Sequence, residues 1–293
     1  MKYGFIGVGN MGHFMAANCM KAGYEMVVSN THAKEAVAEL AKQGAETVDT
    51  NGQVAEKAEI IFLCLPNGDV VESVIEELLD AENSIVKEIY DFSTIAPTTS
   101  QKLGKEGKEN GYKYYDCPIA GGVAGAEAAT LSIMVGCDES EFDHVKEVVA
   151  PMGKNIMYAG ITGSGSAVKM FNNYLGGSGL VACCEVMVMA KKLGIDVENV
   201  FNIINKSTGR NFASETSIIP FLKERDFSPK FATDLFYKDI NIAMETAAEL
   251  KMSVPIGAAT LEAFGAARAM GCGKEHSIAV VKYYEALAGV KVN

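Results

Sequence analysis

The sequence predicts an α/β protein, in which a parallel sheet covered by helices is followed by one long helix and an all-helical second half. Two observations carry this prediction. Short apolar runs alternate with helical patterns from Lys2 to about Tyr158, which is typical of a parallel sheet with helices on both faces. A single proline-free helical pattern then dominates Gly160–Gly194, and no strand pattern follows it.

Composition limits the classes of protein that the chain can belong to. It has 293 residues, 48% of them hydrophobic, which suffices for one large or two medium globular domains. A net charge of −11 without a basic run argues against nucleic acid and anionic membranes as partners. The seven cysteines show no CxxC or Cys/His ligand spacing, so we expect reduced thiols, no metal and a cytoplasmic location. We also expect neither a signal peptide nor a membrane span.

The first strand, Lys2–Ile6, runs directly into a glycine-rich loop, Gly7–Gly12, which reads GVGNMG. A helical pattern, Phe14–Ala22, and a second strand, Glu25–Ser29, follow. This strand–GxGxxG–helix–strand context is the fingerprint of a dinucleotide-binding Rossmann domain.

Each glycine of this loop has a physical task. Gly7 permits a tight turn, Gly9 lets a pyrophosphate approach the backbone, and Gly12 lets the helix pack close to the sheet. The helix N-terminus offers N–H groups and a positive dipole end to phosphate. We therefore predict that the cofactor is bound by Gly7, Gly9, Asn10, Met11 and Gly12.

The end of the second strand indicates which dinucleotide binds. An acidic residue usually stands there to bind the ribose hydroxyls, but this chain has Ser29-Asn30-Thr31-His32, with Lys34 shortly after. Without a carboxylate to repel a 2′-phosphate, we expect Asn30 and Thr31 to contact the cofactor and NADP(H) to be favoured over NAD(H). The alternative is that these residues only cap the next helix, Ala33–Gln43, for which Thr31 is suited.

Strands and helices continue to alternate. The expected strands are Glu59–Leu65, Glu88–Phe92, Tyr112–Asp116, Leu131–Gly136 and one near Asn155–Tyr158, and the expected helices are Asp69–Leu79, one capped by Thr98, and Glu139–Val149. Ligands of parallel sheets bind beyond the carboxyl ends of the strands. Leu65, Pro66 and Thr94 stand at such ends and are candidate cofactor contacts, although ordinary turn chemistry is the alternative.

A second glycine-rich turn, Ala120-Gly121-Gly122, follows the strand that ends at Asp116. Paired glycines expose backbone N–H groups in conformations that larger residues resist, which can form an anion-binding nest. A tight turn without a ligand is the alternative.

The long helical pattern carries its polar groups near its start. From Leu175 to Ala190 it is apolar on almost every side, which predicts a buried helix. Lys169 and Asn173 are four residues apart and so share a face. A lysine on a buried helix is costly without a partner and its pKa shifts readily; the alternative is a snorkelling lysine beside capping amides.

From Ile195 onward the pattern is helical throughout. The expected helices are Val197–Ser207, Thr216–Lys223, Ala232–Lys251, Pro255–Met270 and Glu275–Ala288. We expect two domains, residues 1–162 and 163–293, the second comprising the long helix and a helical substrate and oligomerisation domain.

Four blocks in order, Gly7–Gly12, Asp116–Ala126, Gly160–Asn173 and Lys238-Asp239 with Ala243, resemble the β-hydroxyacid dehydrogenase family over nearly the whole chain. That family contains 3-hydroxyisobutyrate dehydrogenase, tartronate semialdehyde reductase and glyoxylate/succinic semialdehyde reductases, and it is similar to 6-phosphogluconate dehydrogenase. The resemblance implies a long helix between the domains and a C-terminal domain that completes the active site.

The resemblance also implies roles for individual residues. Lys169 would be the catalytic acid/base and Asn173 would orient the substrate, while Gly121 and Gly122 would hold its carboxylate. Further expected contacts are Thr94 near the nicotinamide, Phe231 and Lys238 near the substrate, and Asp239 near the cofactor. The family usually has serine where this chain has Ala120, which puts the identity of the substrate in doubt.

The function that this predicts is hydride transfer between a nicotinamide cofactor and a small β- or γ-hydroxy acid or its semialdehyde. Lys169 would donate the proton to the oxygen in reduction and remove it in oxidation. Imine reduction, oxidative decarboxylation of a sugar-acid phosphate and a catalytically inactive cofactor-binding scaffold are the alternatives. Because the long helix is apolar on most sides, we expect a homodimer or homotetramer.

Overall fold

The computed structural model describes residues 1–29 and 31–292; Asn30, a predicted cofactor contact, lies outside the described residues. The chain divides into two compact units, unit 1 from Met1 to Lys169 and unit 2 from Met170 onward. The division falls inside the long helix α8 (Ser164–Lys192), whereas the sequence places it just before that helix.

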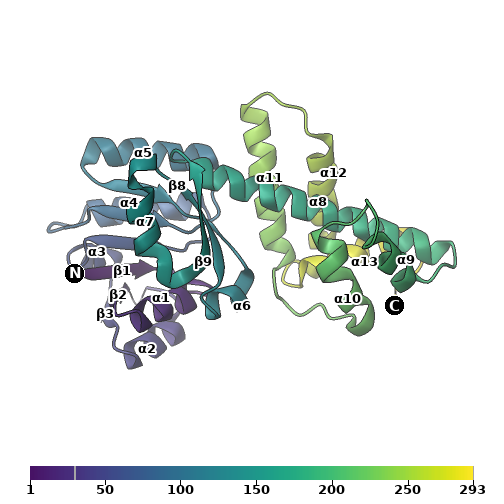
Figure 1. Cartoon of the computed structure of the whole chain (residues 1–293), viewed down its shortest axis with the longest axis horizontal. Helices are drawn as coiled ribbons and strands as arrows, with labels where there is room; N and C mark the ends of the chain where they lie inside the picture. The colour runs from purple at the N-terminus through teal and green to yellow at the C-terminus, as the bar shows by residue number, and fades with distance from the viewer. Residues whose placement is uncertain (30, 293) are drawn as a thin grey trace. The chain divides into compact units, whose positions relative to one another are not determined.

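Unit 1 is built on one sheet (Figure 1). Its strands are β1 (Lys2–Ile6), β2 (Glu25–Ser29), β3 (Glu46–Val48), β4 (Ile60–Leu63), β5 (Glu88–Asp91), β6 (Lys113–Asp116), β7 (Ile119–Ala120), β8 (Leu131–Gly136) and β9 (Gly153–Gly160). They lie in the order β3-β2-β1-β4-β5-β6-β8-β7, with β9 beside β8. The strands from β3 to β6 are parallel, and β8 runs antiparallel to β6 and β7.

Helices cover both faces of this sheet, as the sequence predicts. They are α1 (Gly12–Lys21), α2 (Lys34–Lys42), α3 (Asn51–Ala55), α4 (Gly68–Leu79), α5 (Pro97–Asn110), α6 (Gly122–Glu127) and α7 (Phe142–Val149). Phe62 of β4 packs in a core with α1, α2 and α7, and its neighbour Ile61 packs in a second core with α3, α4 and α5. Successive residues of a strand point to opposite faces, so both faces of this strand are buried.

The structure corrects several local expectations. β3 and α3 were not predicted, and α6 begins where only a turn was expected. Thr98 does not cap α5, because Ala96 is the N-cap and Pro97 takes the first helical position. Thr31 does not cap α2, which starts after Ala33 without a side-chain cap.

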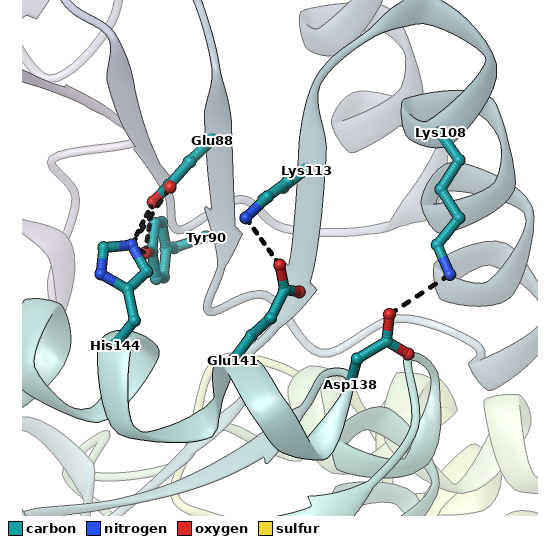
Figure 2. Close-up of polar contacts among 7 residues, drawn as sticks. All are labelled: Glu88, Tyr90, Lys108, Lys113, Asp138, Glu141 and His144. Atoms are coloured by element: carbon teal, nitrogen blue, oxygen red, sulfur yellow. Dashed lines mark hydrogen bonds and ion pairs between the residues drawn. The ribbon is translucent and has the colours of Figure 1, made fainter.

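Charged side chains at the amino ends of β5 and β6 hold α7 and the turn before it against the sheet (Figure 2). Glu88 accepts a hydrogen bond from Tyr90 Oη at 2.6 Å and lies 2.9 Å from His144 Nε2. Lys113 pairs with Glu141 at 2.6 Å. Because parallel sheets bind their ligands at the carboxyl ends of the strands, these groups are packing contacts at the opposite end.

Unit 2 has no strand among its described residues, and its one β contact there is a single bridge between Ala232 and His276. Its α-helices after α8 are α9 (Val197–Ile204), α10 (Ile219–Glu224), α11 (Thr233–Glu249), α12 (Pro255–Ala267) and α13 (Val281–Ala288), and α11 and α12 lie side by side (Figure 1). Its core contains Met187 of α8, Phe201 of α9 and Phe264 of α12.

The prediction that α8 is buried all round is wrong for the single chain. Cys184 and Met187 are fully buried, but Leu175 and Met189 are 70% and 57% exposed. The length and composition of α8 would also allow it to cross a membrane, but core helices of soluble proteins often have the same length and composition. Its buried side chains make it a core helix of unit 2, with apolar residues left on its outer face.

Candidate active site

The glycine-rich loop has the shape that a pyrophosphate requires. A Cβ on Gly12 would lie 2.1 Å from the carbonyl oxygen of Gly7, so only glycine lets α1 start this close to β1. A Cβ on Gly9 would meet nothing within 4 Å, which leaves open space above its backbone. Met11 is the N-cap of α1 and makes no side-chain cap, so the helix presents its first N–H groups to this space. The loop therefore fits a dinucleotide phosphate.

The carboxyl ends of β4 and β5 are joined by buried polar groups. The backbone N–H of Leu65 donates to Ser93 Oγ at 2.9 Å, and the N–H of Ser93 donates to Asp91 Oδ1 at 2.9 Å. These bonds fix the loops that carry the predicted cofactor contacts Leu65, Pro66 and Thr94. The sequence pointed to the loops but not to Asp91, a carboxylate at the end of an apolar strand.

The Gly121-Gly122 turn has the backbone that was predicted for it. Gly121 and Gly122 have φ of 133° and 64°, both in the region that favours glycine. Ala120 ends β7 opposite Ser132 and is partly buried. Asn18, which was not predicted, donates from α1 to the carbonyl of Ala126 at 2.7 Å, so α6, which follows this turn, is tied to α1, which follows the glycine-rich loop. A buried asparagine in an apolar helix was the available signal.

The start of α8 lies at the same edge of the sheet. Asp116, the last residue of β6, accepts the N–H of Gly163 at 2.7 Å and the N–H of Ser166 at 2.8 Å. The carboxyl ends of parallel strands share one edge, so the first turn of α8 and the glycine-rich loop belong to the same side of unit 1. Lys169 follows one turn later, at the end of unit 1, and is 8% exposed.

In unit 2 the predicted residues of α8 and α11 meet. Asn173 is 6% exposed, and its Nδ2 donates to Asp239 Oδ2 at 2.5 Å. Lys238 Nζ lies 3.1 Å from Asp239 Oδ1. The cofactor role of Asp239 stays a prediction, because the contacts the structure gives its carboxylate are to Asn173 and Lys238. These contacts position the amide that lies one turn after Lys169 on α8.

Three further residues of unit 2, Phe231, Asn211 and Arg210, differ in how freely their side chains can meet a substrate. Phe231 packs edge-on against Phe236, with ring centroids 4.9 Å apart, so its ring is fixed by α11. The amide of Asn211 contacts Cys183 Sγ at 3.6 Å and accepts the N–H of Ser214 at 3.0 Å. Arg210, the neighbour of Asn211 in sequence, is exposed. Because the amide of Asn211 already has these partners, Arg210 is the freer of the two to bind the carboxylate of a substrate.

Chemically, these residues combine a phosphate cradle, a glycine nest for an anion and a buried lysine on a fixed helix. Among the described residues, no three His, Cys, Asp or Glu side chains are placed to hold a metal ion. The arrangement suits proton transfer beside a nucleotide.

Family models match both parts of the chain. Residues 2–160 match the family model of the NAD binding domain of 6-phosphogluconate dehydrogenase, and residues 163–284 match that described as NAD-binding of NADP-dependent 3-hydroxyisobutyrate dehydrogenase. The chain is 38% identical to 2-(hydroxymethyl)glutarate dehydrogenase of Eubacterium barkeri, with 100% of this chain and 98% of that protein covered.

Two further relatives cover nearly the whole chain. It is 34% identical to 2-hydroxy-3-oxopropionate reductase of Escherichia coli K12, with 100% of both chains covered. The structure of Mycobacterium tuberculosis 3-hydroxyisobutyrate dehydrogenase with L-serine superposes with a TM-score of 0.88 at 29% identity, covering 97% of this chain and 98% of that one. The chain therefore belongs to the 3-hydroxyisobutyrate dehydrogenase, or β-hydroxyacid dehydrogenase, family and is an NAD(P)-dependent oxidoreductase.

Proposed function

We propose that this enzyme reduces a semialdehyde acid to its hydroxy acid, and oxidises it in reverse, with Lys169 as general acid and base. The observation that carries the proposal is the burial of Lys169 on the first turns of α8, which Asp116 holds at the carboxyl edge of the sheet. A buried lysine on a fixed helix is poised to exchange a proton with a substrate at that edge.

The reaction divides between cofactor and protein. The bound nicotinamide supplies or accepts the hydride at the substrate carbon. In reduction, Lys169 Nζ donates a proton to the oxygen that becomes the hydroxyl, and solvent then restores it. Asn173, held by Asp239 at 2.5 Å, orients the same oxygen without adding charge. The nest at Gly121 and Gly122 binds the substrate carboxylate through backbone N–H groups.

For the cofactor we propose NADP(H) over NAD(H). Thr31, His32 and Lys34 are exposed, and in the sequence no carboxylate stands among residues 29–34 to repel a 2′-phosphate. Thr31 does not cap α2, so helix capping does not explain why threonine stands at this position. Its hydroxyl can donate to a phosphate.

For the substrate we propose an acid longer than tartronate semialdehyde, carrying a second carboxylate. Ala120 lacks the hydroxyl that the family pattern has at this position, so one donor to a short acid is missing. Lys238, which is partly buried, and Arg210, which is exposed, are the cations that we propose for the second carboxylate. The relative of highest identity among those named above is the dehydrogenase of a dicarboxylic hydroxy acid, 2-(hydroxymethyl)glutarate.

Steady-state turnover of the purified enzyme tests these proposals together. The panel contains 2-(hydroxymethyl)glutarate and 3-hydroxyisobutyrate with the oxidised form of each cofactor, and tartronate semialdehyde, glyoxylate and succinic semialdehyde with the reduced form of each. We expect the highest kcat/KM with the dicarboxylic acid and NADP(H). Tighter binding of NADH than NADPH by tenfold would contradict the cofactor proposal, and a preference for the shortest acids would contradict the substrate proposal.

The same assay separates the alternative functions. A cyclic imine reduced faster than every semialdehyde would make the enzyme an imine reductase. Cofactor binding without turnover of any substrate would make it an inactive scaffold. We further propose a cytoplasmic location, which the burial of most of the seven free cysteines supports, since free thiols persist in a reducing compartment.

A further inference from the structure

Asp116 stands at a junction that the reaction described so far does not use. Its side chain is 1% exposed and bridges β6 and α8, with each carboxylate oxygen accepting one backbone N–H. The N–H of Ser166 is in the first turn of α8, where a helix's own N-cap side chain normally binds. Asp116, 50 residues away in sequence, takes that place.

Three glycines near this carboxylate stand where the structure has no space for a side chain. Gly163, at the N-cap position of α8, has φ of 93°, and a Cβ there would lie 2.6 Å from Gln101 Cγ. A Cβ on Gly165 would lie 2.4 Å from the carbonyl oxygen of Met134, and one on Gly136 would lie 2.2 Å from Asp116 Oδ1. With glycine at its N-cap, α8 has no side-chain cap of its own. Side chains at positions 136 and 165 would displace the Asp116 carboxylate, which supplies the cap instead.

A second contact holds the same turn. Ser166 Oγ lies 2.9 Å from Ser100 Oγ of α5, and both serines are buried. The first turn of α8 is thus tied to β6 through backbone N–H groups and to α5 through a hydroxyl. Lys169 is three residues after Ser166, so the position of its Cα follows from these bonds.

We propose that Asp116 is a positioning residue for catalysis: by capping α8 from the end of β6 it sets where Lys169 stands relative to the cofactor-binding edge of unit 1. This inference rests on the proposed role of Lys169. Both carboxyl oxygens accept N–H groups at the N-terminus of α8, which is where a cap side chain stabilises a helix. Loosening these bonds lets the first turn shift, and a displacement of about 1 Å at a reacting group costs about a hundredfold in rate.

The test is a double-mutant cycle of kcat with Asp116→Asn and Lys169→Ala. Asp116→Asn keeps the size of the side chain but turns an NH₂ group toward one of the two N–H donors. We expect its kcat to fall about 10- to 100-fold, with KM and the Kd of the reduced cofactor changed less than about threefold. In the Lys169→Ala background the same change is expected to cost less than about twofold, since Asp116 acts through Lys169.

Asp196→Asn is the matched control. Asp196 caps α9 and its Oδ1 accepts the N–H of Glu198 at 2.9 Å and of Asn199 at 3.4 Å, so the same substitution removes the carboxylate of a helix cap away from Lys169 while an amide oxygen can keep both bonds. We expect it to leave kcat unchanged. If Asp116→Asn does not fold, Asp116→Ser, which is smaller and keeps one acceptor, takes its place in the cycle.

The outcomes are distinct. Equal losses from Asp116→Asn with and without Lys169 would overturn the inference, as would a loss of Tm without a loss of kcat. If Lys169→Ala itself keeps wild-type turnover, the proposed function fails. If Lys169→Ala is inactive while Asp116→Asn turns over normally, only the inference fails.

Discussion

Two buried carboxyl groups stand at the ends of neighbouring strands, Asp91 on β5 and Asp116 on β6. Asp91 accepts the N–H of Ser93 and the hydroxyl of Tyr114, the latter at 2.8 Å. Burial raises the pKa of Asp116 to about 7, against the effect of the N–H bonds from Gly163 and Ser166, which lower it. At the scale of single residues, buried polar groups at this edge fix the loops and the helix that carry the candidate catalytic groups.

Ala120 is the residue at which substrate choice is tested most simply. Ala120→Ser adds a hydroxyl beside the Gly121-Gly122 turn, and a hydrogen bond to a charged group is worth about 1.5–3 kcal/mol. We expect kcat/KM for tartronate semialdehyde or glyoxylate to rise about 10- to 100-fold and that for the dicarboxylic acid to fall. The measurement is the substrate panel above.

Ala124→Ser, the same substitution at an exposed position of α6, is the control and is expected to leave the ranking unchanged. An unchanged ranking in Ala120→Ser as well would mean that position 120 is passive packing.

At the scale of secondary structure, the sequence predicts the elements that have a strong apolar pattern. β1, β2 and β8 lie where expected. β1 and β8 each carry an apolar run bounded by glycine, and the apolar run of β2 follows Gly23 and ends before a polar stretch of the sequence. β3 reads only Glu-Thr-Val and is recruited by pairing with β2, which no local pattern encodes. α3 is only five residues long, yet Thr50 and Gln53 form a capping box at its start, a local signal that could have revealed it.

The candidate site was predictable to a similar degree. The glycine-rich loop and the Gly121-Gly122 turn are local motifs, and both have the predicted conformation. The bonds from Asp116 to α8 and from Asn18 to α6 join residues that are 50 and 108 apart in sequence. Such long-range bonds depend on tertiary packing, so a single sequence can single out a polar residue such as Asn18 but does not give its partner.

The junction of β6 and α8 predicts a dependence of stability on pH. The pKa of Asp116 is raised in the folded chain, so its contribution is fully present below the unfolded pKa of about 4 and is lost as pH rises through about 7. Between pH 5 and 7 we expect the unfolding free energy of the wild type, minus that of Asp116→Asn, to fall by about 1.4 kcal/mol per pH unit.

Urea unfolding of both proteins at several pH values measures this difference in unfolding free energy. The contributions of other titrating groups cancel in the difference, except for groups coupled to Asp116, such as Asp91. A difference that rises with pH would mean that the N–H bonds outweigh burial and that the carboxyl group is ionised throughout.

At the scale of the whole molecule, the apolar outer face of α8 needs a partner. Phe171 and Leu175 are 57% and 70% exposed near its start, and Met189 and Leu193 are exposed near its end. Exposed apolar residues in such a row mark an interface more often than a free surface.

We therefore expect a dimer or tetramer in which α8 and the C-terminal helices bury more than about 1,000 Å². Light scattering at micromolar concentration measures the mass. Leu175→Glu should dissociate the assembly, because it puts a charge into an apolar interface. Ile85→Glu, which changes an exposed apolar residue of a loop in unit 1, should not. A wild-type monomer would refute this expectation.

The central claim, that Lys169 transfers the proton, is tested most directly by the pre-steady-state and steady-state turnover of Lys169→Ala. Acid–base assistance is typically worth about 10²–10⁴-fold, so we predict a loss of kcat of that size with cofactor affinity unchanged. Lys192→Ala, at the other end of the same helix, where Nζ donates to the carbonyl of Ala288 at 2.9 Å, is predicted to keep full turnover. Turnover of Lys169→Ala within about threefold of the wild type would contradict the account.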